Sequence, residues 1–131
     1  SPYSGVLTIF SERLRNKQPL TIFGDGKQTR DFVHVSDVVQ AFAMALESLE
    51  QQGTESPVHA RALNVCSGQT RTLLETIEAF GDAIGLVPVV SFEPPREGDI
   101  LHSSGTSEAL MEALGWSAEM DFKDGLRSLV S

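Results

Sequence analysis

Residues 19–35 read PLTIFGDGKQTRDFVHV and combine two short β-type runs with a glycine-containing turn between them. Leu20–Phe23 and Asp31–Val35 are rich in β-branched and aromatic residues, which favour strands. The intervening Gly24-Asp25-Gly26 suits a turn with positive φ, because glycine has no Cβ to clash there. The stretch therefore predicts strand, tight turn, strand.

The turn places Arg30 beside the start of the second run. A guanidinium group held there suits a phosphate, because its planar array of N–H donors can bind two oxygens at once. A hairpin in which Arg30 pairs with Asp25 or Asp31 at the surface fits the residues equally well, since such ion pairs are common and weak. The residues alone leave both interpretations open.

Outside this stretch, hydrophobic periodicity and capping signals predict a mixed α/β domain. Ser36 is expected to cap a helix, Thr72 and Glu75 have capping-box spacing, and Gly115 is a helix stop. Helices are predicted over residues 5–16, 36–49, 72–84, 106–114 and 122–130, and further strands over 62–66 and 87–92. Residues 50–61 are polar and irregular and are interpreted as a mobile surface loop.

Composition and net charge argue against some classes of binding partner. The 131 residues are 40% hydrophobic and carry a formal net charge of −8, which argues against nucleic acid and anionic membranes as partners. No apolar run reaches the roughly 20 residues that span a bilayer. Cys66 is the sole cysteine, so it fits a reducing compartment such as the cytoplasm and a buried, inert thiol.

The histidines suggest no metal site. His34, His59 and His102 lack metal-ligand spacing, so no metal is expected. His34 falls inside the second β-type run and is interpreted as structural. His102 follows the loop 93–101 and could approach a ligand bound there.

Five motifs in order carry a family resemblance over nine-tenths of the chain. They are SPYSGV at 1–6, the stretch from Pro19 to Val38, LNVCSG at 63–68, PREGDI at 95–100 and LGW at 114–116. Together they resemble the C-terminal, substrate-binding part of the extended short-chain dehydrogenase/reductases. This group contains the nucleotide-sugar epimerases and dehydratases typified by UDP-glucose 4-epimerase.

The resemblance implies a small mixed α/β domain, residues 1–131, from a longer chain whose N-terminal Rossmann part is not included. No glycine-rich dinucleotide motif follows a strand, and Tyr3 with Leu7 does not form the family's Tyr-x-x-x-Lys pair. The fragment is therefore expected to be inactive by itself and to bind no NAD. The whole protein is expected to be an NAD-dependent nucleotide-sugar epimerase and a homodimer.

The resemblance also assigns site residues for a UDP- or dTDP-sugar. Arg30 and Arg96 resemble the two arginines that contact the diphosphate, and Asp99 the carboxylate that accepts hydrogen bonds from the ribose. Ile22 and Phe23 resemble the segment that holds the base through main-chain groups. Alternatives remain for each: Arg96 paired with a neighbouring glutamate, Asp99 capping a turn, and core burial of Phe23.

Two further positions are weaker candidates. Asn64 resembles a residue at a strand end near the substrate, although asparagine is also a common turn former. Val6, with Gly5, resembles the start of a helix flanking the nucleotide, where free N–H groups can face an anion. A 4,6-dehydratase, decarboxylase or reductase remains an alternative to the epimerase, as does a non-catalytic binding module.

Overall fold

The structure is a computed structural model that describes residues 5–130 and divides them into two units. The first unit contains residues 5–29, 71–102 and 121–130, and the second contains residues 30–70 and 103–120. The chain thus passes between the units four times. Residues 1–4, which begin the first family motif and include Tyr3, lie outside the described residues.

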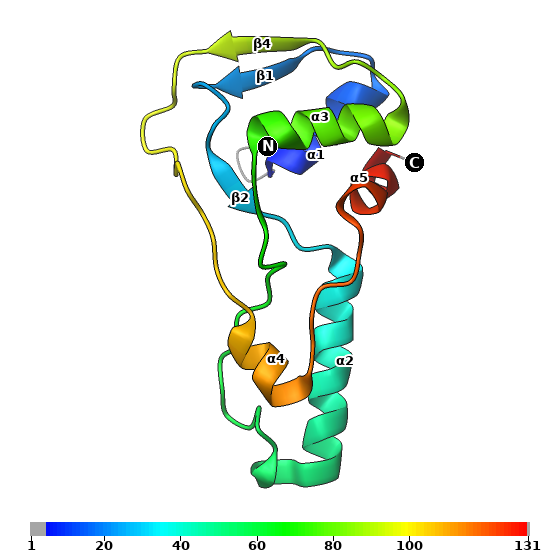
Figure 1. Ribbon diagram of the computed structural model, residues 1–131, viewed down its shortest axis with the longest axis vertical. Coiled ribbons are helices and arrows are strands. Elements are labelled where there is room, and N and C mark those ends of the chain that lie inside the picture. Colours follow the sequence, from blue (N-terminus) through cyan, green and yellow to red (C-terminus); the bar gives the residue numbers. More distant parts are fainter. Residues whose placement is uncertain (1–4, 131) are drawn as a thin grey trace. The chain divides into compact units, whose positions relative to one another are not determined.

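The first unit packs three helices against a two-stranded parallel sheet (Figure 1). Its elements are α1 (Val6–Arg15), β1 (Leu20–Phe23), α3 (Leu73–Ile84), β4 (Val90–Glu93) and α5 (Phe122–Val130). β1 and β4 pair in parallel, from Leu20 opposite Val90 to Phe23 opposite Glu93.

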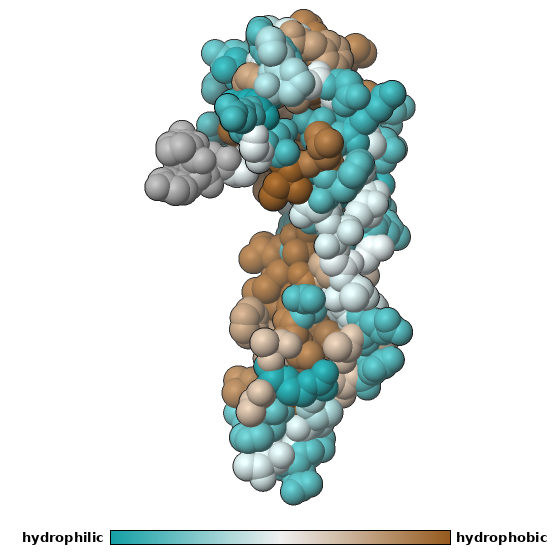
Figure 2. All heavy atoms as spheres, turned by 90° about the vertical axis from the view of Figure 1, so that its left-hand side faces the viewer, coloured by the Kyte–Doolittle hydropathy of each residue, from teal (hydrophilic) through white to brown (hydrophobic). Residues whose placement is uncertain are grey.

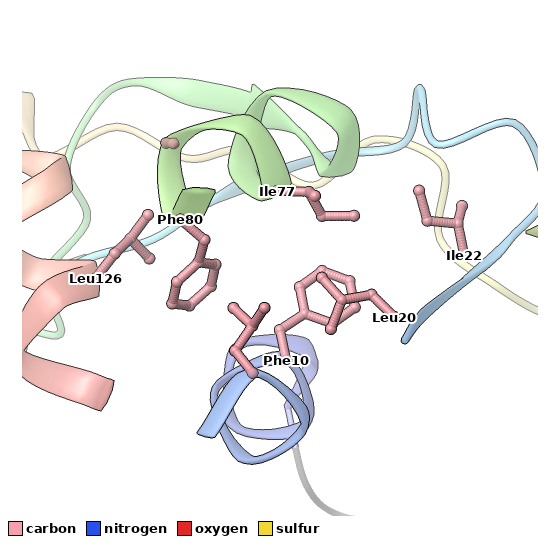
Figure 3. Close-up of a cluster of buried hydrophobic side chains, with 8 residues drawn as sticks. Phe10, Leu20, Ile22, Ile77, Phe80 and Leu126 are labelled. Atoms are coloured by element: carbon pink, nitrogen blue, oxygen red, sulfur yellow. The ribbon is translucent and has the colours of Figure 1, made fainter. Parts of the chain in front are cut away.

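The core of this unit forms where β1 meets the helices (Figure 3). Leu20 and Ile22, alternate residues of β1, are completely buried, as the two-residue period of a strand requires for one face. The three helices contribute the other members of the cluster: Phe10 and Leu14 of α1, Ile77, Ala79 and Phe80 of α3, and Leu126 of α5.

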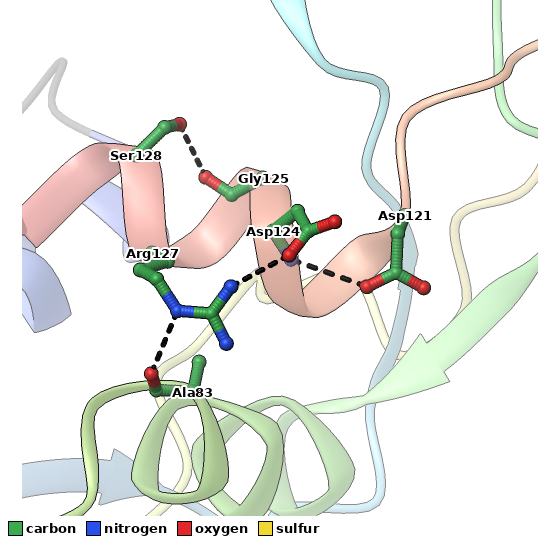
Figure 4. Close-up of polar contacts among 6 residues, drawn as sticks. All are labelled: Ala83, Asp121, Asp124, Gly125, Arg127 and Ser128. Carbon is green, nitrogen blue, oxygen red and sulfur yellow. Dashed lines mark hydrogen bonds and ion pairs between the residues drawn. The ribbon is translucent and has the colours of Figure 1, made fainter.

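Polar contacts join α5 to the end of α3 (Figure 4). The Nε of Arg127 donates to the carbonyl of Ala83 at 3.0 Å, and its Nη1 lies 2.6 Å from the carboxylate of Asp124. The carbonyls of a helix's last turn have no partner within the helix, so the arginine satisfies one of them.

The second unit contains α2 (Val35–Gln52), the 3-10 helix η1 (Gly53–Glu55) and α4 (Glu108–Leu114). Ala41, Leu110 and Trp116 form its buried cluster. The indole Nε1 of Trp116 donates to the carbonyl of Asp37 at 2.9 Å. The buried Asp37 carboxylate accepts the backbone N–H groups of Glu119 and Met120 at 2.9 and 3.1 Å.

One side of α2 is apolar and exposed. Its residues recur at alternating intervals of four and three: Val35, Val39, Phe42, Leu46 and Leu49. Phe42 keeps 71% of its surface exposed. Hydrophobic residues gather on one face of this unit in the space-filling view (Figure 2). None of the helices among residues 5–130 is both long and apolar enough to cross a membrane.

Most predicted helices are confirmed, while two predicted strands are wrong. β2 covers Thr29–Asp31 rather than 31–35, because the backbone turns into α2 at Val35. His34, not Ser36, is the N-cap of α2, and its Nδ1 accepts from the N–H of Ser36. Residues 62–66 form no strand, since among residues 5–130 no neighbouring strand pairs with them.

Two further differences are an additional strand and a longer helix. A strand, β3 (Thr70–Thr72), precedes α3 and was not expected. Within residues 50–61, α2 extends through Gln52 and η1 follows, and Ser56 and Val58 are buried. This stretch is therefore more ordered than an irregular loop, and its mobility stays a prediction.

We expect Phe80→Ala to destabilise the protein by about 3–5 kcal/mol, because it leaves a cavity in a fully buried site. Val87→Ala is the control, since Val87 is 94% exposed, and its effect should stay within about 0.5 kcal/mol. Urea unfolding followed by circular dichroism measures both. Equal losses for the two variants would contradict this account of the core.

We expect Asp37→Asn to cost about 1–3 kcal/mol, because the amide replaces one acceptor oxygen by a donor facing a backbone N–H. Asp82→Asn is the matched control: Asp82 pairs with Lys123 at the surface, so its loss should cost about 0–1 kcal/mol. The same unfolding assay reports both values. A neutral Asp37→Asn would show that these backbone contacts contribute little.

Candidate functional site

A pocket of about 360 Å³ lies in the first unit, between the turn that follows β1 and the loop that follows β4. Phe23, Asp25 and Gln28 line it from the turn, and Glu93, Arg96 and Asp99 from the loop.

The turn is held in shape from inside. Gly24 and Gly26 have φ of 96° and 78°, as their glycine identity predicts. The side chain of Gln28, which is only 6% exposed, donates from Nε2 to the carbonyl of Phe23 at 2.9 Å. This bond closes the turn and fixes the main chain at the end of β1.

The beginning of α3 supports the same turn. The N–H groups of Leu73 and Leu74 donate to the carbonyls of Gln28 and Gly26 at 3.1 and 3.2 Å. Thr72 and Glu75 form the predicted capping box, which satisfies further N–H groups. The first N–H groups of α3 are thus used within the protein, so this helix start offers no cradle for a phosphate.

Arg96 is the most informative side chain of the pocket. Its guanidinium carbon lies 3.7 Å from the centroid of the Phe23 ring, in a cation–π contact. Within residues 5–130 its guanidinium has no hydrogen-bond or ion-pair partner, so the alternative pairing with Glu93 or Glu97 does not occur. The stack uses the face of the guanidinium, and the N–H donors on its edge stay available to a ligand.

Negatively charged side chains outnumber positively charged ones in the lining of the pocket. Asp25, Glu93 and Asp99 contribute carboxylates, while Arg96 contributes the one positive charge among the lining residues. Carboxylates accept hydrogen bonds from hydroxyl groups, so this arrangement suits a polyol next to an anion. A doubly charged diphosphate needs at least one more cation than this pocket supplies.

Three of the seven predicted site residues share this pocket: Phe23, Arg96 and Asp99. The side chain of Ile22 is fully buried in the core, which leaves only its main chain for recognition. Val6 is the first residue of α1 and packs half-buried against the core.

The other two residues, Arg30 and Asn64, belong to the second unit. Arg30 is half-buried in β2, and Asn64 is exposed in the unpaired stretch 62–66. The meeting of Arg30 with Arg96 at one anion stays a prediction.

The role of Gln28 was not predicted from the sequence. Its position five residues after Phe23, just beyond a double-glycine turn, was the available signal, because a long amide side chain there can reach back to close the turn. Asp31 also has a role that was not anticipated: its carboxylate accepts the N–H groups of Ser67 and Gly68 at 2.8 Å each.

Cys66 is half-buried in the second unit rather than deep in a strand. Its backbone N–H donates to Ser107 Oγ at 2.7 Å, and Ser107 Oγ donates to the Cys66 carbonyl at 2.9 Å. These bonds replace the ladder that the strand prediction implied. Among residues 5–130 no group of His, Cys, Asp and Glu is arranged to hold a metal ion.

Comparison with known proteins places the chain in a family. The sequence profile of the NAD dependent epimerase/dehydratase family matches residues 1–66, half of the chain. The chain therefore belongs to this family.

Curated relatives and solved structures agree with this result. A putative UDP-glucose 4-epimerase from Methanocaldococcus jannaschii is 32% identical over 98% of the chain, and a UDP-glucose 4-epimerase from Mycolicibacterium smegmatis is 35% identical over 97%. A UDP-glucose-4-epimerase from Stenotrophomonas maltophila, crystallised with NAD and formylated UDP-arabinopyranose, superposes with a TM-score of 0.83 at 29% identity over 97% of the chain.

The chain spans 38% of the length of each of these three proteins. Relatives with other named reactions match over similar lengths. They include a dTDP-4-dehydro-6-deoxyglucose reductase from Escherichia coli at 30% identity and the UDP-glucuronic acid decarboxylase 1 of Arabidopsis thaliana at 28%.

We expect Gly26→Ala to destabilise the protein more than Gly98→Ala. Both glycines have φ near 80°, so each alanine pays a left-handed backbone cost of roughly 1–2 kcal/mol. A Cβ at Gly26 would also lie 2.7 Å from Leu74 Cγ, whereas one at Gly98 meets no atom within 4 Å. Overpacking should add about 1–3 kcal/mol at Gly26, measured by urea unfolding. Equal costs would show that Leu74 moves aside freely.

Proposed function

We propose that this chain holds the nucleotide diphosphate of a UDP- or dTDP-sugar in an NAD-dependent nucleotide-sugar epimerase similar to UDP-glucose 4-epimerase. The observation that carries the proposal is the Arg96 guanidinium, stacked on Phe23 beside Asp99 without an ion-pair partner among residues 5–130. Because no carboxylate among these residues pairs with the guanidinium, its N–H donors remain available to the oxygens of an anionic ligand, and a second cation is needed to offset the three carboxylates of the lining.

Each lining residue has a role in this proposal. The edge of Arg96 binds phosphate oxygens while Phe23 holds the face of the guanidinium, so the side chain loses less freedom on binding. Asp99 accepts hydrogen bonds from the ribose hydroxyls. The main chain of Ile22 and Phe23, fixed by Gln28, meets the base.

The remaining predicted residues complete the proposed site. Arg30 supplies the second cation that a diphosphate needs beyond Arg96. Asn64 and Val6 are proposed to lie near the sugar and the nucleotide, on the strength of the family resemblance alone.

The turn from β3 into α3 does not suit NAD. A dinucleotide requires a glycine-rich turn between a strand and a helix start with free N–H groups. β3 runs directly into α3, whose first N–H groups are already bonded. We propose that other parts of the polypeptide bind NAD and carry the Tyr-x-x-x-Lys pair, and that the 131 residues alone are inactive.

The contribution of this chain is then positioning. A bound nucleotide restricts where the attached sugar can lie. Holding a reactant in place lowers the entropic part of the activation free energy by several kcal/mol, and the upper limit for a fully oriented reaction is roughly 7–11 kcal/mol. The whole protein is proposed to be a homodimer in a reducing compartment such as the cytoplasm, which the single cysteine of these 131 residues, Cys66, fits.

A second candidate keeps the nucleotide sugar and changes the reaction. The reductase and the decarboxylase named above match the chain at 30% and 28% identity, close to the epimerases. A reductase, decarboxylase or 4,6-dehydratase would use the pocket described here in the same way. Product analysis by NMR, with UDP-glucose, UDP-glucuronic acid and a dTDP-4-keto sugar offered to the intact polypeptide, separates these reactions.

We expect Arg96→Ala in the intact polypeptide to raise the Kd for UDP by about 10- to 100-fold, because a charge-assisted hydrogen bond contributes roughly 1.5–3 kcal/mol. Arg13→Ala, which removes the same charge from the surface of α1, is the control and should change the Kd less than about 2-fold. Calorimetry with UDP measures both. An unchanged Kd for Arg96→Ala would refute the proposed site.

The same titrations test Asp99. If the Asp99 carboxylate accepts hydrogen bonds from both ribose hydroxyls, Asp99→Asn should raise the Kd for UDP by a larger factor than the Kd for dTDP, because the deoxyribose of dTDP lacks the 2′-hydroxyl. An equal loss for the two nucleotides would place Asp99 away from the 2′ position.

A further inference from the structure

The pocket lies between two places where the segment after β1 and the segment after β4 are hydrogen-bonded to each other. β1 and β4 run in parallel up to Phe23 and Glu93, and the N–H of Gly24 still donates to the Glu93 carbonyl at 2.9 Å. The two segments then separate around the pocket. They rejoin at Thr29, whose N–H donates to the carbonyl of Leu101 at 2.7 Å.

A side-chain contact reinforces this second junction. Thr29 forms an isolated parallel bridge with His102, and Thr29 Oγ1 lies 3.0 Å from His102 Nδ1. The imidazole of His102 is exposed, so water could satisfy its ring nitrogens if the bond to Thr29 were absent. We call this pair, Thr29 with His102, the clasp.

The clasp closes the loop that carries the ligand-binding candidates. Residues 94–101 connect Glu93 to His102, and Arg96 and Asp99 lie between these two anchors. The N–H of Asp99 donates to the carbonyl of Arg96 at 3.3 Å, so the two residues share one turn. The clasp adds a side-chain contact to the main-chain bond between Thr29 and Leu101 at this end of the loop. A loop held less firmly here would have to be ordered when a ligand binds, at a cost in conformational entropy.

We propose that Thr29 and His102 are positioning residues, which hold the 94–101 loop so that Arg96 and Asp99 face the nucleotide before it binds. This inference rests on the proposed function. It adds two residues that act through the loop.

The first test compares Thr29→Val with Thr29→Ser in the intact polypeptide. Valine has the shape of threonine without its hydroxyl, and serine keeps the hydroxyl. We expect Thr29→Val to raise the Kd for UDP by about 3- to 10-fold, and Thr29→Ser to stay within about 2-fold. Thr8→Val, an exposed threonine on α1, is the matched control and should leave the Kd unchanged.

The partner residue allows a second, independent comparison. His102→Leu should resemble Thr29→Val, and the double variant should be no weaker than either single one, because both remove the same bond. Additive losses would overturn the clasp. So would equal affinities of Thr29→Val and Thr29→Ser.

The final test separates positioning from general stability. If the clasp acts through the loop, Thr29→Val should weaken UDP binding by a smaller factor in an Arg96→Ala background than in the unaltered protein. The same factor in both backgrounds would overturn the proposal. If Arg96→Ala itself leaves the Kd unchanged, the proposed function fails and the clasp with it; if Arg96→Ala weakens binding but Thr29→Val does not, the clasp alone fails.

Discussion

The burial of alternate residues along β1 is the constraint on which the first unit depends. Leu20 and Ile22 are completely buried under α1, α3 and α5, and the two-residue period of a strand then turns Phe23 away from the core interior. A shift of one residue would exchange these faces, exposing the core side chains and burying Phe23. The same register aligns Phe23 with Glu93, so the hydrophobic core also determines where the pocket begins.

The turn after β1 and the contact between Phe23 and Arg96 depend on the position of Phe23 at the end of that strand. The two positive-φ glycines let the chain reverse after Phe23, and Gln28 closes the reversal with one hydrogen bond. Phe23 then offers an aromatic face to Arg96. The face of the guanidinium stacks on Phe23 while the N–H donors on its edge remain available. An apolar residue can therefore orient an arginine without using its donors, whereas the ammonium group of a lysine has no flat face to stack.

How well the sequence predicted the structure depended on how local each signal was. The capping box at Thr72 and the glycine stop at Gly115 involve residues a few positions apart, and both are present as expected. α5 has the predicted bounds, 122–130, because its apolar spacing and its length are local properties too. Contacts within one turn of backbone need no knowledge of the rest of the chain.

Predictions that needed a distant partner were less successful. Residues 62–66 have the composition of a strand, but a strand requires a neighbour for its N–H and C=O groups, and residues 5–130 provide none. His34 was read as part of a strand because of its β-branched neighbours, while its ring caps α2. Of the residues that line the pocket, Phe23, Arg96 and Asp99 were named by the resemblance. The contacts of Gln28 and Thr29 became visible only in the structure, since their partners are not evident from the sequence pattern.

The exposed side of α2 affects how the chain behaves in concentrated solution. Apolar side chains at four- and three-residue intervals are typical of a helix with a neighbour along its length, yet Val35, Val39, Phe42 and Leu46 are more than half exposed. Contact between two such surfaces removes apolar area from water, while the net charge of −8 keeps molecules apart at low ionic strength. Added salt screens that repulsion and leaves the attraction in place, so colloidal stability of the 131-residue chain decreases as ionic strength rises.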